Sequence, residues 1–301
     1  MTEFMSLNVR GLGDPIKRRE TFHWLHKNRA KVILLQETHS TPEDEMRWKA
    51  EWGAQIIFSH GTSNARGVCI LLKNNVTFEI HELHCSEKGH YLVLDITLEQ
   101  IRITLANIYG PNQDNPTFFR KIMDIIESLP NDNRLLGGDF NLVLNIERDK
   151  RGGNPVTHRK SQELINSWID NLDLIDVWRK EHPDLFQFTW KRNRPSNIFC
   201  RLDFFLLSRG MFGGTQKTWI SPGFRTDHSV IGIKLDLTQK IRGPGFWKLN
   251  CKHLHDTAYV QLVKETIAET KQFNPNTNPA LLWDTIKCRI RGITIAYASK
   301  L

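Results

Sequence analysis

Short apolar runs separated by polar breaks recur through the first 240 residues and predict strands. These runs lie at 4–9, 31–37, 68–73, 78–84, 91–98, 101–109, 134–140, 200–208 and 229–237. Most are apolar at consecutive positions, which is typical of strands covered on both faces. Apolar residues at helical spacing predict helices over 15–27, 116–129 and 161–174. Strands with inserted helices indicate an α/β (α+β) fold with more than one sheet.

The pattern changes after the Gly/Pro break LTQKIRGPG at 238–246. Beyond it, amphipathic spacing predicts one helix over 255–272 and a second that begins near Pro279. We therefore predict one domain over 1–238 and a basic, mostly helical segment over 239–301. Because the chain stops at TIAYASKL without a capping residue or polar tail, we expect it to be a segment of a longer protein.

Composition narrows the class of partner. No apolar run approaches the roughly 20 residues that span a bilayer, and the N-terminus lacks a signal-peptide pattern. The five cysteines are scattered without CxxC spacing, which predicts reduced thiols in an intracellular protein and neither disulfides nor a zinc site. The net charge of +8 predicts a polyanionic partner, nucleic acid before an anionic membrane. Residues 240–301 hold ten basic and four acidic residues and carry most of this excess.

Polar side chains stand at the ends of six apolar runs. They are Asn8 in SLN, Glu37 in LLQET, Tyr109 and Asn112 in NIYGPN, Asp139 and Asn141 in GGDFN, Asp203 in RLDF, and Asp227 and His228 in TDHS. Each alone is open to interpretation as a turn residue, a hydrogen-bonded core amide or a solvated acid. Together they favour a chemical site, because polar groups at strand ends converge on one edge of a sheet.

The order of these segments resembles the endonuclease/exonuclease/phosphatase superfamily, the group of deoxyribonuclease I and the abasic-site endonucleases. The matching segments are SLNVRGL, LLQETH, NIYGPN, GGDFN, CRLDFFLLS and TDHSVI, in family order over residues 4–237. The resemblance implies a four-layer α/β sandwich with a helical extension, and metal-dependent cleavage of phosphodiester bonds.

The resemblance also implies roles for single residues. Glu37 would bind Mg²⁺, with Mn²⁺ as a substitute, because hard cations take oxygen ligands. Asn8 and Asp227 would complete or orient that metal site. Asp139 would hold and deprotonate the attacking water, with Asn141 fixing the water or a phosphate oxygen.

His228 would donate to the scissile phosphate, and Asp203 would orient its ring. Substrate contacts are expected from Tyr109, Asn112, Thr189, Thr226 and Arg201. Thr226 stands where many relatives carry Ser, a change that keeps the hydroxyl. For Arg201 the residue type leaves a second interpretation open, that of a structural ion-pair partner.

Two basic loops, at 148–160 and 191–197, favour contacts with a phosphate backbone, although a merely solvated loop has the same composition. The second loop includes Arg192 and Arg194 and corresponds in the resemblance to a hairpin that probes DNA. Residues 243–301, with WKLN and WDTIKCRIRGITIAYASK, resemble the segment after the endonuclease in LINE-type non-LTR retrotransposon polyproteins.

The resemblance to these polyproteins implies a nuclear endonuclease that nicks double-stranded DNA and leaves a 3′-hydroxyl to prime reverse transcription. Element RNA would be a second partner through the parent polyprotein, and no membrane is expected. One alternative is an abasic-site repair endonuclease, although Cys200 stands where that branch is expected to place an aromatic wall. Another is an inactive nucleic-acid-binding module, which the intact set of matched positions disfavours.

Overall fold

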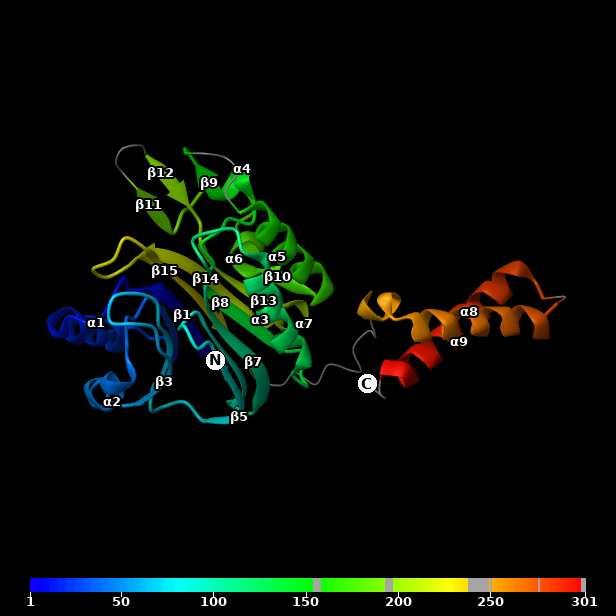
Figure 1. Ribbon diagram of the computed structural model, residues 1–301, viewed down its shortest axis with the longest axis horizontal. Helices are drawn as coiled ribbons and strands as arrows, with labels where there is room; N and C mark the ends of the chain where they lie inside the picture. The colour runs from blue at the N-terminus through cyan, green and yellow to red at the C-terminus, as the bar shows by residue number, and fades with distance from the viewer. Residues whose placement is uncertain (154–157, 193–196, 238–248, 250, 276, 299–301) are drawn as a thin grey trace. The chain divides into compact units, whose positions relative to one another are not determined.

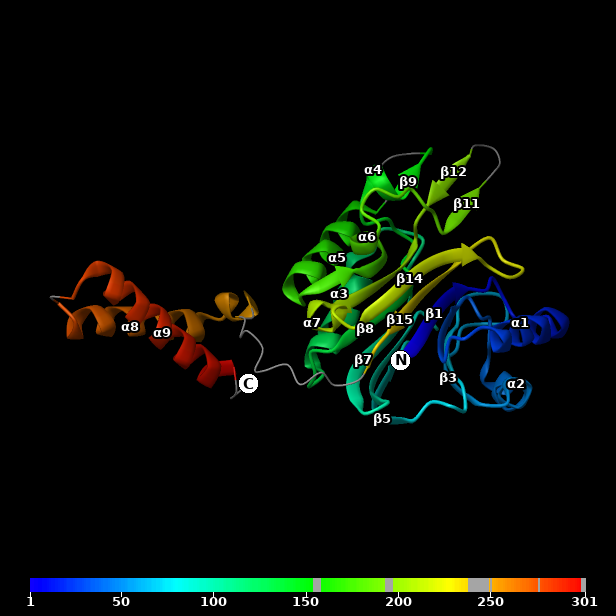
Figure 2. The same ribbon diagram turned by 180° about the vertical axis from the view of Figure 1, so that it is seen from behind.

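The computed structural model describes residues 1–301 except 154–157, 193–196, 238–248, 250, 276 and 299–301 (Figures 1 and 2). The chain divides into two compact units, Met1–Lys240 and Ile241–Leu301. Within the described residues, none of the helices combines the length and apolar character needed to cross a membrane.

Two six-stranded sheets form the centre of the first unit. The first has the order β14-β15-β1-β2-β4-β3. Its strands are Thr215–Pro222 (β14), Ser229–Leu235 (β15), Thr2–Asn8 (β1), Val32–Gln36 (β2), Val68–Leu72 (β4) and Gln55–Ser59 (β3). The second has the order β10-β13-β8-β7-β6-β5. Its strands are Leu174–Asp176 (β10), Asp203–Ser208 (β13), Arg134–Asp139 (β8), Ile101–Tyr109 (β7), Tyr91–Leu98 (β6) and Phe78–Cys85 (β5). A small third sheet pairs β11 (Trp190–Arg192), β12 (Ile198–Cys200) and β9 (Lys150–Arg151).

Helices cover the outer faces of both large sheets. Helices α1 (Pro15–Lys27) and α2 (Glu45–Trp52) pack on the first sheet, and α3 (Pro116–Ser128) and α5 (Arg159–Asn171) pack on the second. Proline near the first turn and a capping side chain explain where two of them begin: Asp14 caps α1 and Asn115 caps α3. The shorter helices are η1 (Pro42–Asp44), α4 (Ile146–Asp149), α6 (Val177–Glu181) and α7 (Arg209–Phe212).

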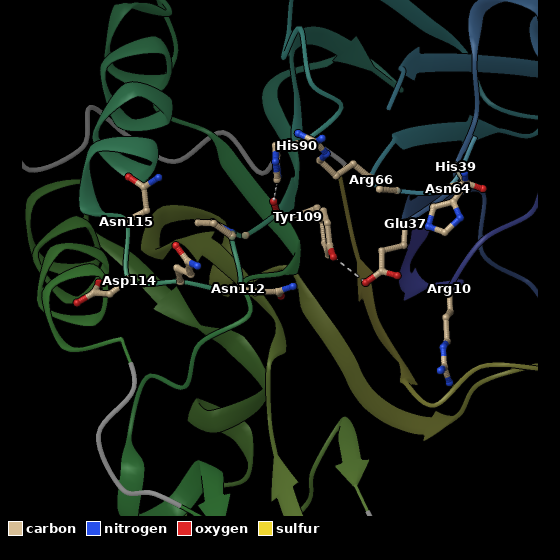
Figure 3. A pocket seen from close by; sticks show the side chains of 14 residues that line it. Arg10, Glu37, His39, Asn64, Arg66, His90, Tyr109, Asn112, Asp114 and Asn115 are labelled. Atoms are coloured by element: carbon tan, nitrogen blue, oxygen red, sulfur yellow. Dashed lines mark hydrogen bonds between the residues drawn. The ribbon is translucent and has the colours of Figure 1, made fainter. Parts of the chain in front are cut away.

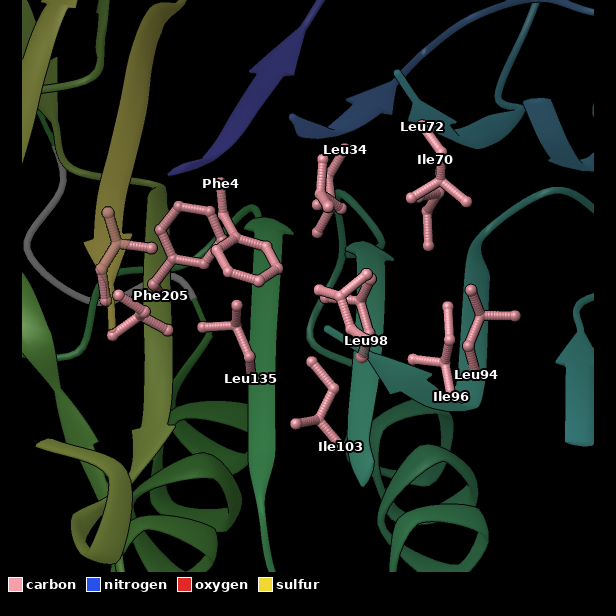
Figure 4. Close-up of a cluster of buried hydrophobic side chains, with 14 of the residues drawn as sticks. Phe4, Leu34, Ile70, Leu72, Leu94, Ile96, Leu98, Ile103, Leu135 and Phe205 are labelled. Atoms are coloured by element: carbon pink, nitrogen blue, oxygen red, sulfur yellow. The ribbon is translucent and has the colours of Figure 1, made fainter. Parts of the chain in front are cut away.

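Alternation along the strands builds three apolar cores. Val32 and Leu34 face the core between the sheets, whereas Ile33 and Leu35 face α1 and α2. In the second sheet, Leu135 points into the central core and Leu136 points toward α3 and α5. Figure 4 shows side chains of both sheets meeting in the central core. The layers run helix, sheet, sheet, helix, which confirms the predicted four-layer α/β sandwich.

The structure corrects several boundaries. The predicted strand at 200–208 is two strands, because β12 ends at Cys200 and β13 begins at Asp203. Helix α5 ends at Asn171 rather than at Leu174, and Leu174 is the first residue of β10. Elements α2, β3 and β14 were not predicted. Helix α2 ends at Trp52, because Gly53 after it takes a φ of 71° and forms a left-handed cap.

The second unit is a helical hairpin. After η2 (Cys251–His255), α8 spans Thr257–Phe273 and α9 spans Pro279–Ala298, close to the predicted ranges. Asp256 caps the start of α8. The two helices share a buried hydrogen bond of 2.7 Å between the Tyr259 and Thr294 hydroxyl groups. The assignment of this unit as a separate linker segment stays a prediction.

Candidate active site

Strand register brings four of the predicted site residues to one edge. Strands β1 and β2 are parallel, with Asn8 beside Gln36, so Asn8 and the following Glu37 leave their strands together. Strands β7 and β8 are also parallel, and they end with Tyr109 beside Asp139. Parallel neighbours end at the same sheet edge, so the two pairs are delivered by the fold itself.

Two antiparallel strands begin at this edge. Strand β13 starts at Asp203, directly opposite Asp139 on β8. Strand β15 starts at Ser229, and His228 before it forms an isolated bridge with Trp190. The six segments singled out in the sequence therefore meet at one place.

A shared amide ties the acids of the two sheets together. Asn8 Nδ2 donates to Glu37 Oε1 at 3.0 Å and to Asp139 Oδ2 at 2.9 Å. The Tyr109 hydroxyl donates to the same Glu37 oxygen at 2.7 Å (Figure 3). Burial and the Glu37 carboxylate raise the pKa of Tyr109, which keeps this phenol a donor.

His228 lies between two buried carboxylates. Its Nδ1 is 2.9 Å from Asp203 Oδ2, and its Nε2 is 3.8 Å from Asp139 Oδ2. Because a carboxylate accepts, Nδ1 carries a proton and donates to Asp203. Nε2 is thereby directed toward Asp139 and the reacting position.

The charges in this group shift the pKa values of Asp139 and His228. Burial, followed by the Asp203 charge, raises the pKa of Asp139 to about 7. For His228, burial favours the neutral ring, but the charges of Asp203 and Asp139 outweigh it and raise the pKa to about 10. A carboxyl with a pKa near neutrality beside a protonated imidazole is the combination that acid–base chemistry at pH 7 requires.

The backbone is strained or unusually close at three of these positions. Glu37 and Asn141 have φ values of 51° and 53°, in the left-handed region. The Asn141 N–H donates to Asp139 Oδ1 at 2.9 Å, and its side-chain amide donates to Gly110 O at 2.8 Å. Gly138 has a φ of 141°, and a Cβ there would collide with the Ile108 carbonyl. Only a residue without a side chain therefore allows β8 to lie this close to β7 at Gly138.

The donor set fits a hard divalent cation. One carboxylate oxygen of Asp139, one of Asp203 and a ring nitrogen of His228 all lie within 4.8 Å of one another, and the two oxygens are the ligand atoms, because a protonated ring has no free lone pair. Glu37 Oε1 is engaged by Asn8 and Tyr109, while no hydrogen bond to Oε2 is found in the described part of the chain. Asp203 Oδ1 is buried without a hydrogen-bond partner among the described residues. Clustered carboxylates that must otherwise take up protons are suited to a bound metal ion.

Asp227, the third predicted metal ligand, is held by two side chains. Its Oδ2 accepts from Trp190 Nε1 at 3.2 Å and pairs with Arg10 at 3.5 Å. No hydrogen bond joins it to Asn8 or Glu37 among the residues described.

The two threonines brace the backbone. The Thr226 hydroxyl donates to Asn8 O at 2.8 Å and accepts from the His228 N–H at 3.3 Å. The buried Thr189 hydroxyl accepts from the N–H groups of Leu202 and Asp203 at 2.9 and 3.1 Å. Both therefore hold catalytic candidates in position, and the substrate contacts expected for them stay a prediction.

Arg201 is a structural residue. It is 1% exposed and pairs with Asp149 at 2.8 Å and with Asp176 at 2.5 Å. A side chain buried in this way cannot reach the substrate, which one interpretation of Arg201 expected it to contact. It agrees with the other interpretation, that of a structural ion-pair partner. The pairs join α4 and the end of β10 to the residue between β12 and β13.

The remaining predicted contact residues lie near the surface. Asn112 is exposed and lines the cavity beside Glu37. Arg192 is exposed at the end of β11, which pairs with β12 beside the loop predicted at 191–197. Arg194 lies outside the described residues.

A cavity of about 630 Å³ adjoins Glu37 and Tyr109 (Figure 3). Sequence reasoning missed three of its residues, Arg10, Arg66 and His90. Arg10 lies within the matched segment SLNVRGL, a position that could have drawn attention to it. Arg66 and His90 sit in loops without any pattern that marks them.

Comparison with known proteins agrees with this site. Residues 5–228 match the Endonuclease/Exonuclease/phosphatase family. A Xenopus laevis protein described as transposon TX1 uncharacterized 149 kDa protein is 27% identical over 265 residues. This alignment covers 87% of the chain but 20% of that relative, so the chain spans about a fifth of its length. The likeness to a transposon protein supports the resemblance seen in the sequence.

Solved structures share the fold. The AP endonuclease LMAP from Leishmania major has a TM-score of 0.64 at 16% identity, covering 77% of this chain and 86% of that one. An AP endonuclease from Archaeoglobus fulgidus has a TM-score of 0.63 at 15% identity, covering 79% and 100%. The 3′ phosphatase NExo from Neisseria, bound to product DNA hairpin, has a TM-score of 0.60 at 18% identity, covering 78% and 100%. The chain therefore belongs to the endonuclease/exonuclease/phosphatase family of nucleases and phosphodiesterases.

Proposed function

We propose that this chain is a Mg²⁺-dependent endonuclease that nicks double-stranded DNA and leaves a 3′-hydroxyl. The observation that carries the proposal is the buried Asp139–His228–Asp203 group, joined to Glu37 through Asn8. The transposon relative supports DNA as the substrate, and the family supports phosphodiester cleavage.

The residues divide the work of hydrolysis. Asp139 accepts the proton of the attacking water, and its pKa of about 7 leaves it poised for that transfer near neutral pH. His228 donates from Nε2 to a phosphate oxygen, while Asp203 holds Nδ1–H and favours the charged ring. Asn141, held by its left-handed backbone, orients the water or an oxygen of the phosphate.

Glu37, with Asn8 and Asp227 nearby, would hold Mg²⁺, for which Mn²⁺ is a substitute. When bound, this ion offsets the charge that grows on the phosphate and the leaving oxygen. Tyr109 fixes one Glu37 oxygen so that the other stays directed to the cavity side.

The biological setting follows from the transposon relationship. We infer that the nick primes reverse transcription of element RNA by a longer parent polyprotein, and that it is made in the nucleus. The basic residues of the β9, β11 and β12 sheet, Lys150, Arg151, Lys191 and Arg192, would contact the phosphate backbone.

The test is a plasmid-nicking assay with the full chain, supercoiled DNA and Mg²⁺. We expect open circles from the wild type, near-complete loss with Asp139→Ala and with His228→Ala, and loss on adding EDTA. Nicking by both variants at the wild-type rate would refute the assignment of these residues to the active site. A strong preference for a duplex with one abasic position would assign the chain to abasic-site repair instead.

A further inference from the structure

Three loops supply the wall of the cavity beside Glu37. Residues 37–40 contribute Glu37 and His39, residues 60–67 contribute Arg66, and residues 86–90 contribute His90. Figure 3 shows these side chains around one opening, with Arg66 close to His90. The catalytic interpretation uses Glu37 and leaves the rest of this wall without a role.

Backbone contacts lock the three loops together. The Thr38 N–H donates to Gly67 O at 2.9 Å, and the His39 N–H donates to Arg66 O at 2.8 Å. Gly67 N–H in turn donates to Gly89 O at 3.0 Å. Gly67 has a φ of 87°, and a Cβ there would lie 2.5 Å from Thr38 Oγ1. The backbone of Arg66 is therefore fixed against the residues that follow Glu37.

A buried polar chain adds to this rigidity. Ser40 Oγ lies 3.1 Å from His60 Nδ1, and His60 Nε2 lies 3.0 Å from Glu45 Oε1 on α2. Although the order Ser, His, Glu is that of a nucleophilic triad, Ser40 is 0% exposed, so no substrate reaches it. The chain anchors the loops to α2.

The acids that line the cavity are already engaged. Asp114 accepts from the Lys160 and Ser161 N–H groups at 3.0 and 2.9 Å and from the Ser161 hydroxyl at 2.6 Å. These three hydrogen bonds occupy the carboxylate oxygens of Asp114 at the first turn of α5. Glu37 is bound by Asn8 and Tyr109.

Arg66 is a cation in the cavity without an acidic partner. Arg10 pairs with Asp227 at 3.5 Å, whereas Arg66 makes no ion pair within the described part of the chain. His90 Nδ1 lies 3.0 Å from Tyr109 O, to which it donates, and its ring stacks on Tyr109. A half-buried guanidinium in a rigid loop, with the exposed amide of Asn64 in the same loop and that of Asn112 also lining the cavity, is suited to an oxyanion.

We propose that Arg66 binds a phosphate of the substrate strand next to the scissile one, so that the cavity is a second phosphodiester subsite on the Glu37 side. This inference rests on the proposed DNA-nicking function and deepens it. The subsite would place the strand relative to Glu37 without touching the reacting atoms, so Arg66 is a positioning residue.

The experiment combines protein and DNA substitutions on a duplex whose nick position has been mapped. Each phosphate within two linkages of the nick is replaced in turn by an uncharged methylphosphonate, and kcat and KM are measured for the wild type, Arg66→Ala and Arg66→Lys. Arg209→Ala is the matched control, because Arg209 is an exposed arginine that follows β13 at the end opposite Asp203.

We expect Arg66→Ala to raise KM about tenfold with kcat nearly unchanged, and Arg66→Lys to restore part of the loss. The slope of log(kcat/KM) against log salt should fall by about 0.9, the value for one phosphate contact. At one linkage, the methylphosphonate should lower kcat/KM of the wild type about tenfold and should not lower kcat/KM of the Arg66→Ala variant any further.

Three outcomes would overturn the subsite. The first is an Arg66→Ala variant that nicks as well as Arg209→Ala. The second is that the losses from Arg66→Ala and from the methylphosphonate add at every linkage. The third is that Arg66→Ala lowers kcat and leaves KM unchanged. A wild type that nicks no DNA would refute the proposed function itself, and is distinguishable because the other results presuppose normal wild-type nicking.

Discussion

The contact between Asp203 and His228 offers a direct test of how the site is charged. The substitution Asp203→Asn keeps an oxygen that accepts from Nδ1 at the observed 2.9 Å but removes the negative charge. Two carboxylates raise the pKa of His228 from 6.5 to about 10, and Asp203 is the first of them. Opposite charges about 4 Å apart interact by about 4 kcal/mol at an effective dielectric constant near 20, which is about three pKa units.

We therefore expect the pKa of His228 in Asp203→Asn to fall from about 10 to about 7. The pKa of Asp139 should also fall, because the Asp203 charge helps to raise it. Because a pKa near 7 leaves about half of the ring protonated at pH 7, kcat should drop only about twofold there, and about 100-fold at pH 9, where the wild-type ring is still mostly protonated. Both limbs of the pH–rate profile should move toward acid.

The assay is an NMR titration of the His228 ring in the metal-free chain, for the wild type and Asp203→Asn, followed by nicking rates from pH 5 to 10 with Mg²⁺. A raised pKa in the folded chain means that the protonated ring stabilises the fold fully below pH 6.5 and loses that effect as pH rises through about 10. The difference in free energy of unfolding between Asp203→Asn and the wild type should therefore shrink as the pH rises from 6.5 to about 10. A His228 pKa that moves by less than about half a unit would refute the reasoning.

Three further predictions test the supports of the site. Tyr109→Phe removes one hydrogen bond to Glu37 and should lower kcat roughly five- to tenfold, with unchanged DNA affinity in a gel-shift assay; an equal rate would show that the bond is dispensable. Arg201→Met leaves Asp176 without its cation and Asp149 with Arg179 alone, so urea unfolding should show about 3–5 kcal/mol less stability, and a loss below about 1 kcal/mol would contradict the buried ion pairs. Removing divalent metal with EDTA should abolish nicking, and added Mg²⁺ should restore it; activity that persists in EDTA would exclude the metal role.

Apolar runs predicted most of the large sheets, because their strands are buried on both faces and leave continuous hydrophobic stretches. Strands β3 and β14 were missed, since both lie at the edges of the first sheet and carry only brief apolar runs between polar residues. The acids at strand ends could be predicted because register is a property of the backbone. Arg66 could not, and the role of Arg201 stayed open between two interpretations, because the environment of a long cationic side chain depends on loops that are distant in sequence.

The position of β15 determines when the chain becomes competent during its synthesis. This strand lies between β14 and β1 in the finished sheet, and His228 immediately precedes it. A ribosome makes Asn8, Glu37 and Asp139 long before that histidine, so a nascent chain holds the acids without the imidazole. On the proposed function, cutting begins only after the last strand has left the ribosome and entered the sheet. An incomplete translation product that stops short of β15 would then be harmless to DNA.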